Sequence, residues 1–415
     1  MDSEKNIVLH NQNKAMINPS ATGWIDKFFI KQQLSEHNVS ETEASFYKNL
    51  RKTGFIYGHI ISFDTTFEIK TKDWFKEEIS KLALLNALYG IFSLTNKEKE
   101  PSDFIKQANL FYKEMHPEGF SLFKKIVPKH SPSLTLEKII DERVQTNDNI
   151  INKNFSHLVT NALLFIDVLA FRQYLLQGQI PDKYLKKIEE TIVNIVILAL
   201  KIKNNKSQYD DLLIKLFEAS IRYSKFSKKE NITLETLDLA YFTAELEKKY
   251  LIDIAGMALW SDGVIENNES YFLHTLANSL SIEDDFVTLS ISNTDSFISK
   301  YKKDIPYFNY SNPVKHFYDQ TTNSVITLIS RNKSRLVKEI IQSKELMLLL
   351  AHSTHRDLDE KEKKKVKKQL LDVCKTIPSL TIFLLPGGSL LLPLLIKFIP
   401  TLLPSAFNEN LNNED

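Results

Sequence analysis

The sequence predicts an all-α protein made of multi-helix bundles, with a proline-interrupted hydrophobic helix or hairpin near the C-terminus. Apolar residues recur every three or four positions along most of the chain, which is typical of helices that bury one face. Only 10 glycines and 13 prolines occur in 415 residues, too few for the turns of a β-sandwich or barrel. Residues 380–403 are apolar with a single charge. These features together favour long helices joined by short loops.

Composition excludes several classes of function. The 53 basic and 52 acidic residues give a net charge of +1, so no overall field attracts nucleic acid, and no direct sequence-specific nucleic-acid partner is expected. The single cysteine, Cys374, rules out an intramolecular disulfide and a cysteine-based zinc site. The polar N-terminus has no apolar run of signal-peptide length, which predicts that the bulk of the protein stays in the cytoplasm.

The order of elements predicts four regions: a flexible N-terminus (1–20), an N-terminal helical domain (21–230), a second helical region (231–331) and a C-terminal region (332–415). The first helix begins near Trp24, after the turn-forming stretch Pro19–Thr22. Amphipathic or apolar periodicity then predicts helices over residues 74–94, 103–115, 158–176, 188–202 and 210–226.

The second region carries a candidate metal site. A long helix is expected from Leu234 to Ala258, followed by an Asp-Gly turn and a helix over residues 267–280. This pattern resembles the TerB-like domains of tellurite resistance over residues 237–282. Asp262, Glu266 and Glu269 are the acids that a divalent cation would need at such a turn. The alternative is that these acids stabilise the positive N-terminal end of the following helix. No other cofactor is expected.

No template of enzyme catalysis is found in the sequence. It has no glycine-rich phosphate loop, no His-Glu-x-x-His and no Gly-x-Ser-x-Gly, and Cys374 lacks the surroundings of a nucleophile. His352 and His355 lie one turn apart, a spacing that suits a metal, although most such pairs are solvated. The sequence therefore predicts a protein that is not an enzyme.

A membrane-associating segment is predicted at the C-terminus. Residues 380–403 meet the length and composition of a bilayer span, with Lys397 as their single charge. Prolines spaced by seven residues and a Pro-Gly-Gly break would free backbone carbonyls in lipid, which a packed hairpin or a homo-oligomer would satisfy. The residues that define this segment are Pro386, Gly387, Gly388, Pro393, Lys397, Pro400 and Pro404. A central helix of a soluble bundle is the alternative.

A run of lysines precedes this segment and would hold it at the cytoplasmic side of a membrane, where anionic lipid attracts basic residues. The predicted location is the cytoplasmic face of the bacterial inner membrane, with the cytoplasm as the alternative. The lipid-facing basic residues are Lys361, Lys363, Lys364, Lys365, Lys367 and Lys368.

Residues 349–407 resemble the transmembrane region of the Letm (leucine-zipper, EF-hand-containing transmembrane protein) family. The matching pieces are the charged stretch Asp359–Lys363, the junction Lys375–Pro378 and the terminal stretch Leu392–Phe407. The whole chain is similar to the Letm-related, so-called biofilm-associated proteins of bacteria. This resemblance implies cation/proton exchange or ribosome binding as functions.

The chain departs from the Letm pattern in the features expected for cation/proton exchange and for ribosome binding. Ser389 occupies the place of the carboxylate in the family's Pro-x-x-Glu-x-x-x-Pro pattern, and only eight residues follow Phe407, too few for a complete ribosome-binding domain after the hydrophobic segment. The prediction is therefore a membrane-associated helical protein that binds a protein partner or the ribosome. A component of cation/proton transport or ion homeostasis and a soluble helical scaffold are the alternatives.

Overall fold

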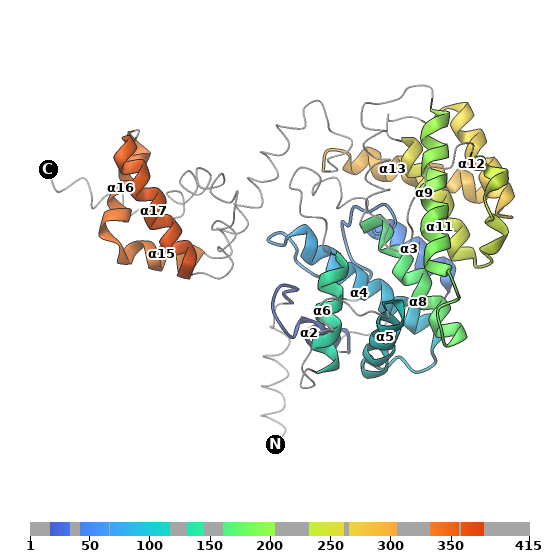
Figure 1. Ribbon diagram of the computed structural model, residues 1–415, viewed down its shortest axis with the longest axis horizontal. Helices are drawn as coiled ribbons and strands as arrows, with labels where there is room; N and C mark the ends of the chain where they lie inside the picture. Colours follow the sequence, from blue (N-terminus) through green and yellow to red (C-terminus); the bar gives the residue numbers. More distant parts are fainter. Residues whose placement is uncertain are drawn as a thin grey trace, which may run out of the picture. The chain divides into compact units, whose positions relative to one another are not determined.

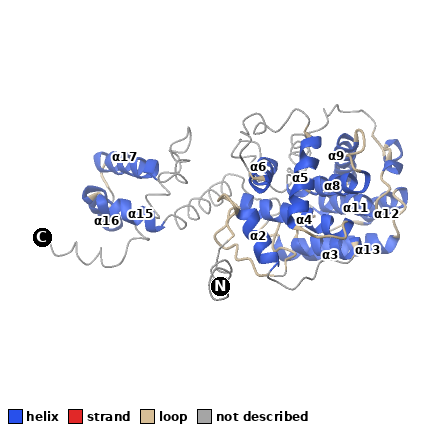
Figure 2. Ribbon diagram, turned by 90° about the horizontal axis from the view of Figure 1, so that it is seen from below, coloured by secondary structure: helices blue, strands red, loops and turns tan. Residues whose placement is uncertain are grey.

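The structure, a computed structural model, confirms the all-α fold. It describes residues 17–33, 42–65, 67–116, 131–144, 161–203, 232–260, 265–304, 333–356 and 358–376. Within these ranges the chain forms thirteen α-helices and two short 3₁₀ helices, with no β-strand (Figure 2). The predicted hydrophobic segment 380–403 lies outside the described residues. So do residues 261–264, which include the predicted turn.

The chain divides into two compact units. Residues 1–69 and 76–311 form the N-terminal unit, and residues 70–75 and 312–415 form the C-terminal unit. The described helices of residues 232–304 thus belong to the same unit as the helices before them. The predicted boundaries near residues 230 and 331 fall outside the described residues and stay predictions.

The first part of the N-terminal unit is arranged around one apolar helix, α4. Helix α4 packs against α3, α5, α6 and α8, so nearly all of its sides are covered (Figure 1). Leu84, Leu85 and Leu88 along its length are fully buried. A helix enclosed in this way needs no polar face, which explains its almost continuous apolar sequence. The helices are α2 (Trp24–Gln33), α3 (Glu43–Thr53), α4 (Lys76–Thr95), α5 (Pro101–Met115), α6 (Pro132–Val144) and α8 (Phe165–Gln177).

Helix α2 begins at Trp24, as predicted, but a distant residue satisfies its first backbone donors. Both carboxylate oxygens of Glu137, in α6, accept backbone hydrogen bonds of 3.1 Å, from Gly23 and from Ile25. The first N–H groups of a helix have no partner within the helix, and a carboxylate also suits its positive end. Glu137 therefore joins the start of α2 to α6.

The second part of the N-terminal unit is arranged around α11. This helix packs against α9, α12 and α13 (Figure 1). Tyr250, Leu251 and Ile252 are fully buried within it, so it is enclosed as α4 is. The helices are α9 (Tyr184–Ile202), α11 (Glu245–Leu259), α12 (Asn267–Ser279) and α13 (Asp284–Tyr301).

The predicted long helix from Leu234 to Ala258 is wrong at its N-terminal end. Two 3₁₀ helices, η2 (Leu234–Thr236) and η3 (Leu239–Tyr241), occupy its first part, and α11 starts only at Glu245. The Glu247 carboxylate accepts a 3.2 Å hydrogen bond from the backbone N–H of Ala244, which marks the start of the helix. The predicted helix over 267–280 is confirmed by α12.

Two buried arginine–aspartate pairs join helices of the N-terminal unit. Arg51, in α3, donates to both oxygens of Asp253, in α11, at 2.7 and 2.6 Å, and the Tyr47 hydroxyl donates to the same carboxylate at 2.6 Å. Arg143, in α6, pairs in the same two-point manner with Asp167, in α8. A buried carboxylate is stable only when it is paired and hydrogen-bonded, so each pair fixes the positions of its helices.

The C-terminal unit contains three described helices that pack against one another: α15 (Lys333–Gln342), α16 (Lys344–His355) and α17 (Glu360–Thr376). Their small apolar core consists of one side of each helix together with Leu358, in the loop before α17. Its buried residues are Leu336, Ile340, Leu346, Leu349, Leu350, Leu358, Val366, Leu370, Val373 and Cys374.

Among the helices that the structure describes, none is long and apolar enough to cross a membrane.

Candidate functional site

Helix α17 carries the basic run that the sequence singled out in the C-terminal unit. A reciprocal set of hydrogen bonds fixes its start. The Asp359 carboxylate accepts from the backbone N–H groups of Lys361 and Glu362 at 2.8 and 2.7 Å, while Glu362 accepts from the backbone N–H of Asp359 at 2.9 Å. This is a capping box, which satisfies several of the donors that a helix start leaves unpaired. The helix therefore begins at a defined residue.

An arginine from the preceding loop reinforces this start. Arg356 donates through both terminal nitrogens to the two oxygens of Glu362, at 2.8 and 2.6 Å. This pair and the backbone hydrogen bond from Asp359 lower the pKa of Glu362 to about 2. Glu362 therefore stays ionised over the physiological pH range and remains fixed as an acceptor.

One face of α17 is apolar. Val366, Leu370 and Val373 are buried and follow one another at spacings of four and three residues. Cys374 lies beside them and is also buried, and burial raises the pKa of its thiol to about 11. The thiol is therefore protonated at neutral pH and behaves as a small apolar side chain, in agreement with the absence of a nucleophile context in the sequence.

The opposite face of α17 is a stripe of lysines. Lys361, Lys364, Lys368 and Lys375 are separated by three, four and seven residues, and all four are exposed. At 100° per residue they lie within an arc of about 60°. We call these four residues the lysine stripe. It points away from the apolar side of the helix.

The other lysines of the predicted basic run are arranged differently. Lys363 pairs with Glu360 at 3.1 Å, and Lys365 pairs with Glu345, at the start of α16, at 2.8 Å. Gln369 also donates to Glu345, at 2.6 Å. Lys365 thus helps to join α17 to α16. All six lysines of the run are exposed, but at least these two have structural partners.

Within the lysine stripe, Lys361 and Lys364 form no ion pair with any residue that the structure describes, whereas Lys375 pairs with Asp372 at 2.7 Å. Like charges one turn apart on a helix destabilise it by roughly 0.2–0.5 kcal/mol per pair. The stripe therefore does not stabilise α17. Its geometry suits contact with an anionic surface, because adjacent cations can each bind a separate negative group.

The predicted metal site is only partly described. Glu269 is 1% exposed, and its carboxylate accepts a 2.9 Å hydrogen bond from the backbone N–H of Glu266, at the start of α12. Glu269 therefore does what the alternative interpretation expects of an acid at a helix start. Asp262 lies outside the described residues, and no cluster of three metal-ligating side chains occurs within them. The cation site stays a prediction.

The predicted membrane residues, from Pro386 to Pro404, also lie outside the described part of the chain. The association of this segment with a membrane, as a span or as a hairpin, stays a prediction.

The fold and site define a helical protein whose C-terminal unit presents a basic helix face. Residues 358–415 match the family LETM1-like, RBD, in which RBD stands for ribosome-binding domain. The match supports the Letm-related resemblance in this segment. No curated protein and no solved structure matches the chain.

The match also corrects the expected position of the ribosome-binding similarity. The Letm resemblance implied such a domain after the hydrophobic segment. The matched region instead begins at Leu358, just before α17, and extends through the hydrophobic segment. Helix α17 is the part of this region that the structure describes.

Proposed function

We propose that this chain is a non-enzymatic helical protein that binds the ribosome through its C-terminal unit, with the lysine stripe of α17 in contact with ribosomal RNA phosphates. The observation that carries the proposal is the coincidence of two features. The region that resembles a ribosome-binding domain contains α17, and α17 presents Lys361, Lys364 and Lys368 on one exposed face.

The chemistry of the contact follows from the charge. Lysine binds phosphate as a compact point charge and reads no sequence, so it suits a surface of folded RNA on which phosphates are dense. This agrees with a chain of net charge +1, because the basic residues act as a local face and not through an overall field. Binding of this kind weakens as salt rises, since it depends on the release of counterions.

We further propose that the hydrophobic segment 380–403 places the bound ribosome close to the cytoplasmic face of a membrane. The support is the sequence: the apolar segment begins only four residues after α17 ends. Fractionation of cells that express the full chain tests this, beside a chain that ends at Thr376. Retention that only detergent releases, and that truncation abolishes, is expected. Release of the full chain by carbonate alone would contradict an inserted segment.

Ribosome binding is tested by sedimentation of the full chain with purified bacterial ribosomes. The variant Lys361→Gln/Lys364→Gln/Lys368→Gln removes three charges of the lysine stripe. The matched control Lys97→Gln/Lys106→Gln/Lys113→Gln removes three exposed charges of the N-terminal unit. We expect the wild type and the control to sediment with ribosomes, and the stripe variant to stay in the supernatant. Equal sedimentation of all three would contradict the role of the stripe.

A further inference from the structure

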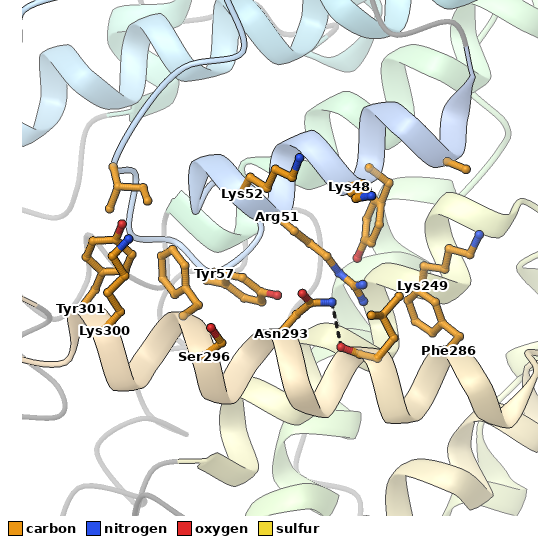
Figure 3. A pocket seen from close by; sticks show the side chains of 15 residues that line it. Lys48, Arg51, Lys52, Tyr57, Lys249, Phe286, Asn293, Ser296, Lys300 and Tyr301 are labelled. Atoms are coloured by element: carbon orange, nitrogen blue, oxygen red, sulfur yellow. Dashed lines mark hydrogen bonds between the residues drawn. The ribbon is translucent and has the colours of Figure 1, made fainter.

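A cavity in the N-terminal unit has the features of a ligand site that the proposed function does not use. It lies between α3 and α13, with the loop after α3 at one end and Lys249 of α11 at the other (Figure 3). Its volume is about 570 Å³, within the range that binds small molecules in proteins. Residues from three distant parts of the sequence therefore form one concave surface.

The cavity is cationic. Four lysines and one arginine line it, and no aspartate or glutamate does. Lys48 and Lys300 form no ion pair with any residue in the described ranges, and both are exposed. Lys249 is held by Glu245, one turn earlier in α11. The cations that remain without a carboxylate therefore lie on the two sides of the cavity, on α3 and on α13 (Figure 3).

Arg51 is fixed at the base of this surface. Its Nε and one terminal nitrogen bind Asp253, and its guanidinium also lies over the ring of Phe286, at 4.6 Å from the ring centre. The other terminal nitrogen, Nη1, makes no hydrogen bond to a described residue. Arginine has five N–H donors, so this nitrogen can still donate to a ligand. Because Asp253 orients the guanidinium in advance, little conformational entropy is lost on binding.

The hydroxyl of Tyr57 is a further donor at the cavity. Tyr57 is 1% exposed, and its side chain points along the cavity toward Arg51 and Asn293 (Figure 3). Its hydroxyl lies beside the buried Thr294 side chain, but neither oxygen makes a hydrogen bond of normal length and angle to a described residue. The hydroxyl can therefore turn to a ligand at little cost. Burial also raises the pKa of Tyr57 well above its usual value, so the hydroxyl remains a donor at neutral pH.

The rest of the lining is apolar and aromatic. Phe297 and Tyr301 lie one turn apart on α13, and their rings are 5.0 Å apart. Leu289 is 53% exposed at the rim. An inorganic anion would leave these groups uncovered, whereas an organic anion would cover them with its apolar body.

From these observations we infer that the cavity between α3 and α13 binds a small soluble organic phosphate, with the phosphate held by Lys48, Arg51 and the Tyr57 hydroxyl, and an apolar or aromatic body against Phe297 and Tyr301, toward the end where Lys300 lies (Figure 3). Several donors that converge on one charged group, beside an apolar wall, are the arrangement by which proteins orient such ligands. No covalent step is involved.

Titration of the full chain with naphthyl phosphate, followed by calorimetry, tests this assignment. Inorganic phosphate lacks the aromatic body, and naphthol lacks the charge. We expect naphthyl phosphate to bind at least about tenfold more tightly than either, because each lacks one of the two contacts. Equal affinity for naphthyl phosphate and inorganic phosphate would overturn the organic part of the inference. No binding of naphthyl phosphate would overturn the whole.

Two variants assign the binding to this cavity. Lys48→Gln should weaken naphthyl phosphate binding by about tenfold or more, whereas the control Lys97→Gln, outside the cavity, should not change it. Tyr57→Phe removes only the hydroxyl. It should weaken binding several-fold, and thermal unfolding without ligand checks that the unit stays folded after loss of the contact with Thr294. Unchanged binding in both cavity variants would place the ligand elsewhere and overturn the inference.

The phosphate could also belong to a lipid headgroup. A competition experiment distinguishes a soluble ligand from a lipid. Vesicles of phosphatidylcholine with phosphatidic acid, compared with vesicles of phosphatidylcholine alone, present that group on a bilayer. If the ligand is a soluble compound, the vesicles with phosphatidic acid should not displace naphthyl phosphate. Displacement that depends on phosphatidic acid would contradict the soluble source.

Discussion

The guanidinium of Arg51 and the carboxylate of Asp253 form a two-point ion pair inside the N-terminal unit, although 202 residues separate them in the sequence. Asp253 is fully buried and also accepts hydrogen bonds from Tyr47 and Ser290. One carboxylate thus joins α3, α11 and α13. The same pair supports the base of the cavity, so the fold of this unit and its proposed ligand site depend on one contact.

Substitution of Asp253 should destabilise the N-terminal unit strongly. Asp253→Asn leaves the Arg51 charge buried without its partner, a change that costs about 3–5 kcal/mol. Urea denaturation followed by tryptophan fluorescence measures the loss, because Trp24 and Trp260 are buried in this unit. The control Glu190→Gln breaks an exposed pair with Lys186 in the same unit and should cost less than about 1 kcal/mol. Similar losses in the two variants would show that the buried pair is not a main determinant of stability.

Gly54 should be intolerant of alanine. It ends α3 with φ +79°, and an added Cβ would lie 2.0 Å from the carbonyl oxygen of His59. Gly178 ends α8 with nearly the same φ, +78°, but a Cβ there meets nothing within 4 Å. Gly178→Ala should therefore cost only the left-handed backbone strain, about 1 kcal/mol, and Gly54→Ala at least about 2 kcal/mol. The free energies of unfolding compare the two, and equal losses would exclude a role for the close approach.

His59 should make the N-terminal unit sensitive to acid. Burial lowers the pKa of His59 from 6.5 to about 4, and the nearby Lys76 ammonium adds to the decrease. Below pH 6.5 the unfolded chain binds a proton that the folded chain does not bind until about pH 4. Stability is therefore lost as the pH falls through this window, by about 3 kcal/mol at most.

The variant His59→Gln isolates this effect. Between pH 6.5 and 4, its free energy of unfolding should fall less steeply than that of the wild type, because carboxylates titrate alike in both proteins. Lys97→Gln, which removes an exposed charge of the same unit that stays positive over this pH range, serves as the control and should keep the wild-type slope. A slope for His59→Gln equal to that of the wild type would argue that His59 is already protonated in the folded state.

Removal of the lysine stripe should leave the C-terminal unit folded. Lys361, Lys364 and Lys368 are exposed and lie on the face of α17 opposite its buried residues. Their replacement by glutamine should change the free energy of unfolding by less than about 0.5 kcal/mol, and relief of repulsion would favour an increase. Thermal unfolding followed by circular dichroism measures this. A large loss of helix would instead assign these lysines a structural role, and the ribosome experiment would then need single substitutions.

The sequence predicted the helices that are marked by the spacing of their own apolar residues and by turn residues at their ends. Helix α12 and the start of α2 were placed correctly, because apolar spacing and turn residues mark them within a few positions. The start of α11 was misplaced since Leu234 and Leu237 continue its apolar spacing although they lie in and beside a 3₁₀ turn. Helix α13 was not anticipated. Its sequence is rich in serine, threonine and β-branched residues, and packing against α11 outweighs their low helix propensity.

The cavity could not be predicted for a different reason. Lys48 and Arg51, on α3, and Lys300, on α13, have no motif in common, and about 250 residues lie between them. Only the folded unit brings them together. Three lysines of the stripe, Lys361, Lys364 and Lys368, were predicted as part of a basic run, because these charges lie close together in the sequence. The pairing of Lys365, another lysine of that run, depends on Glu345, in α16, which no local pattern relates to α17.

The dependence of ribosome binding on salt tests the central proposal most directly. The full chain, labelled at its N-terminus, is titrated with purified bacterial ribosomes at increasing potassium chloride, for the wild type and for Lys361→Gln/Lys364→Gln/Lys368→Gln. Each lysine that contacts a phosphate contributes about one unit to the slope of log affinity against log salt. We predict that the variant binds more weakly and that its slope is smaller by about two to three. Equal affinity and equal slope in the two proteins would contradict a contact between the lysine stripe and ribosomal RNA.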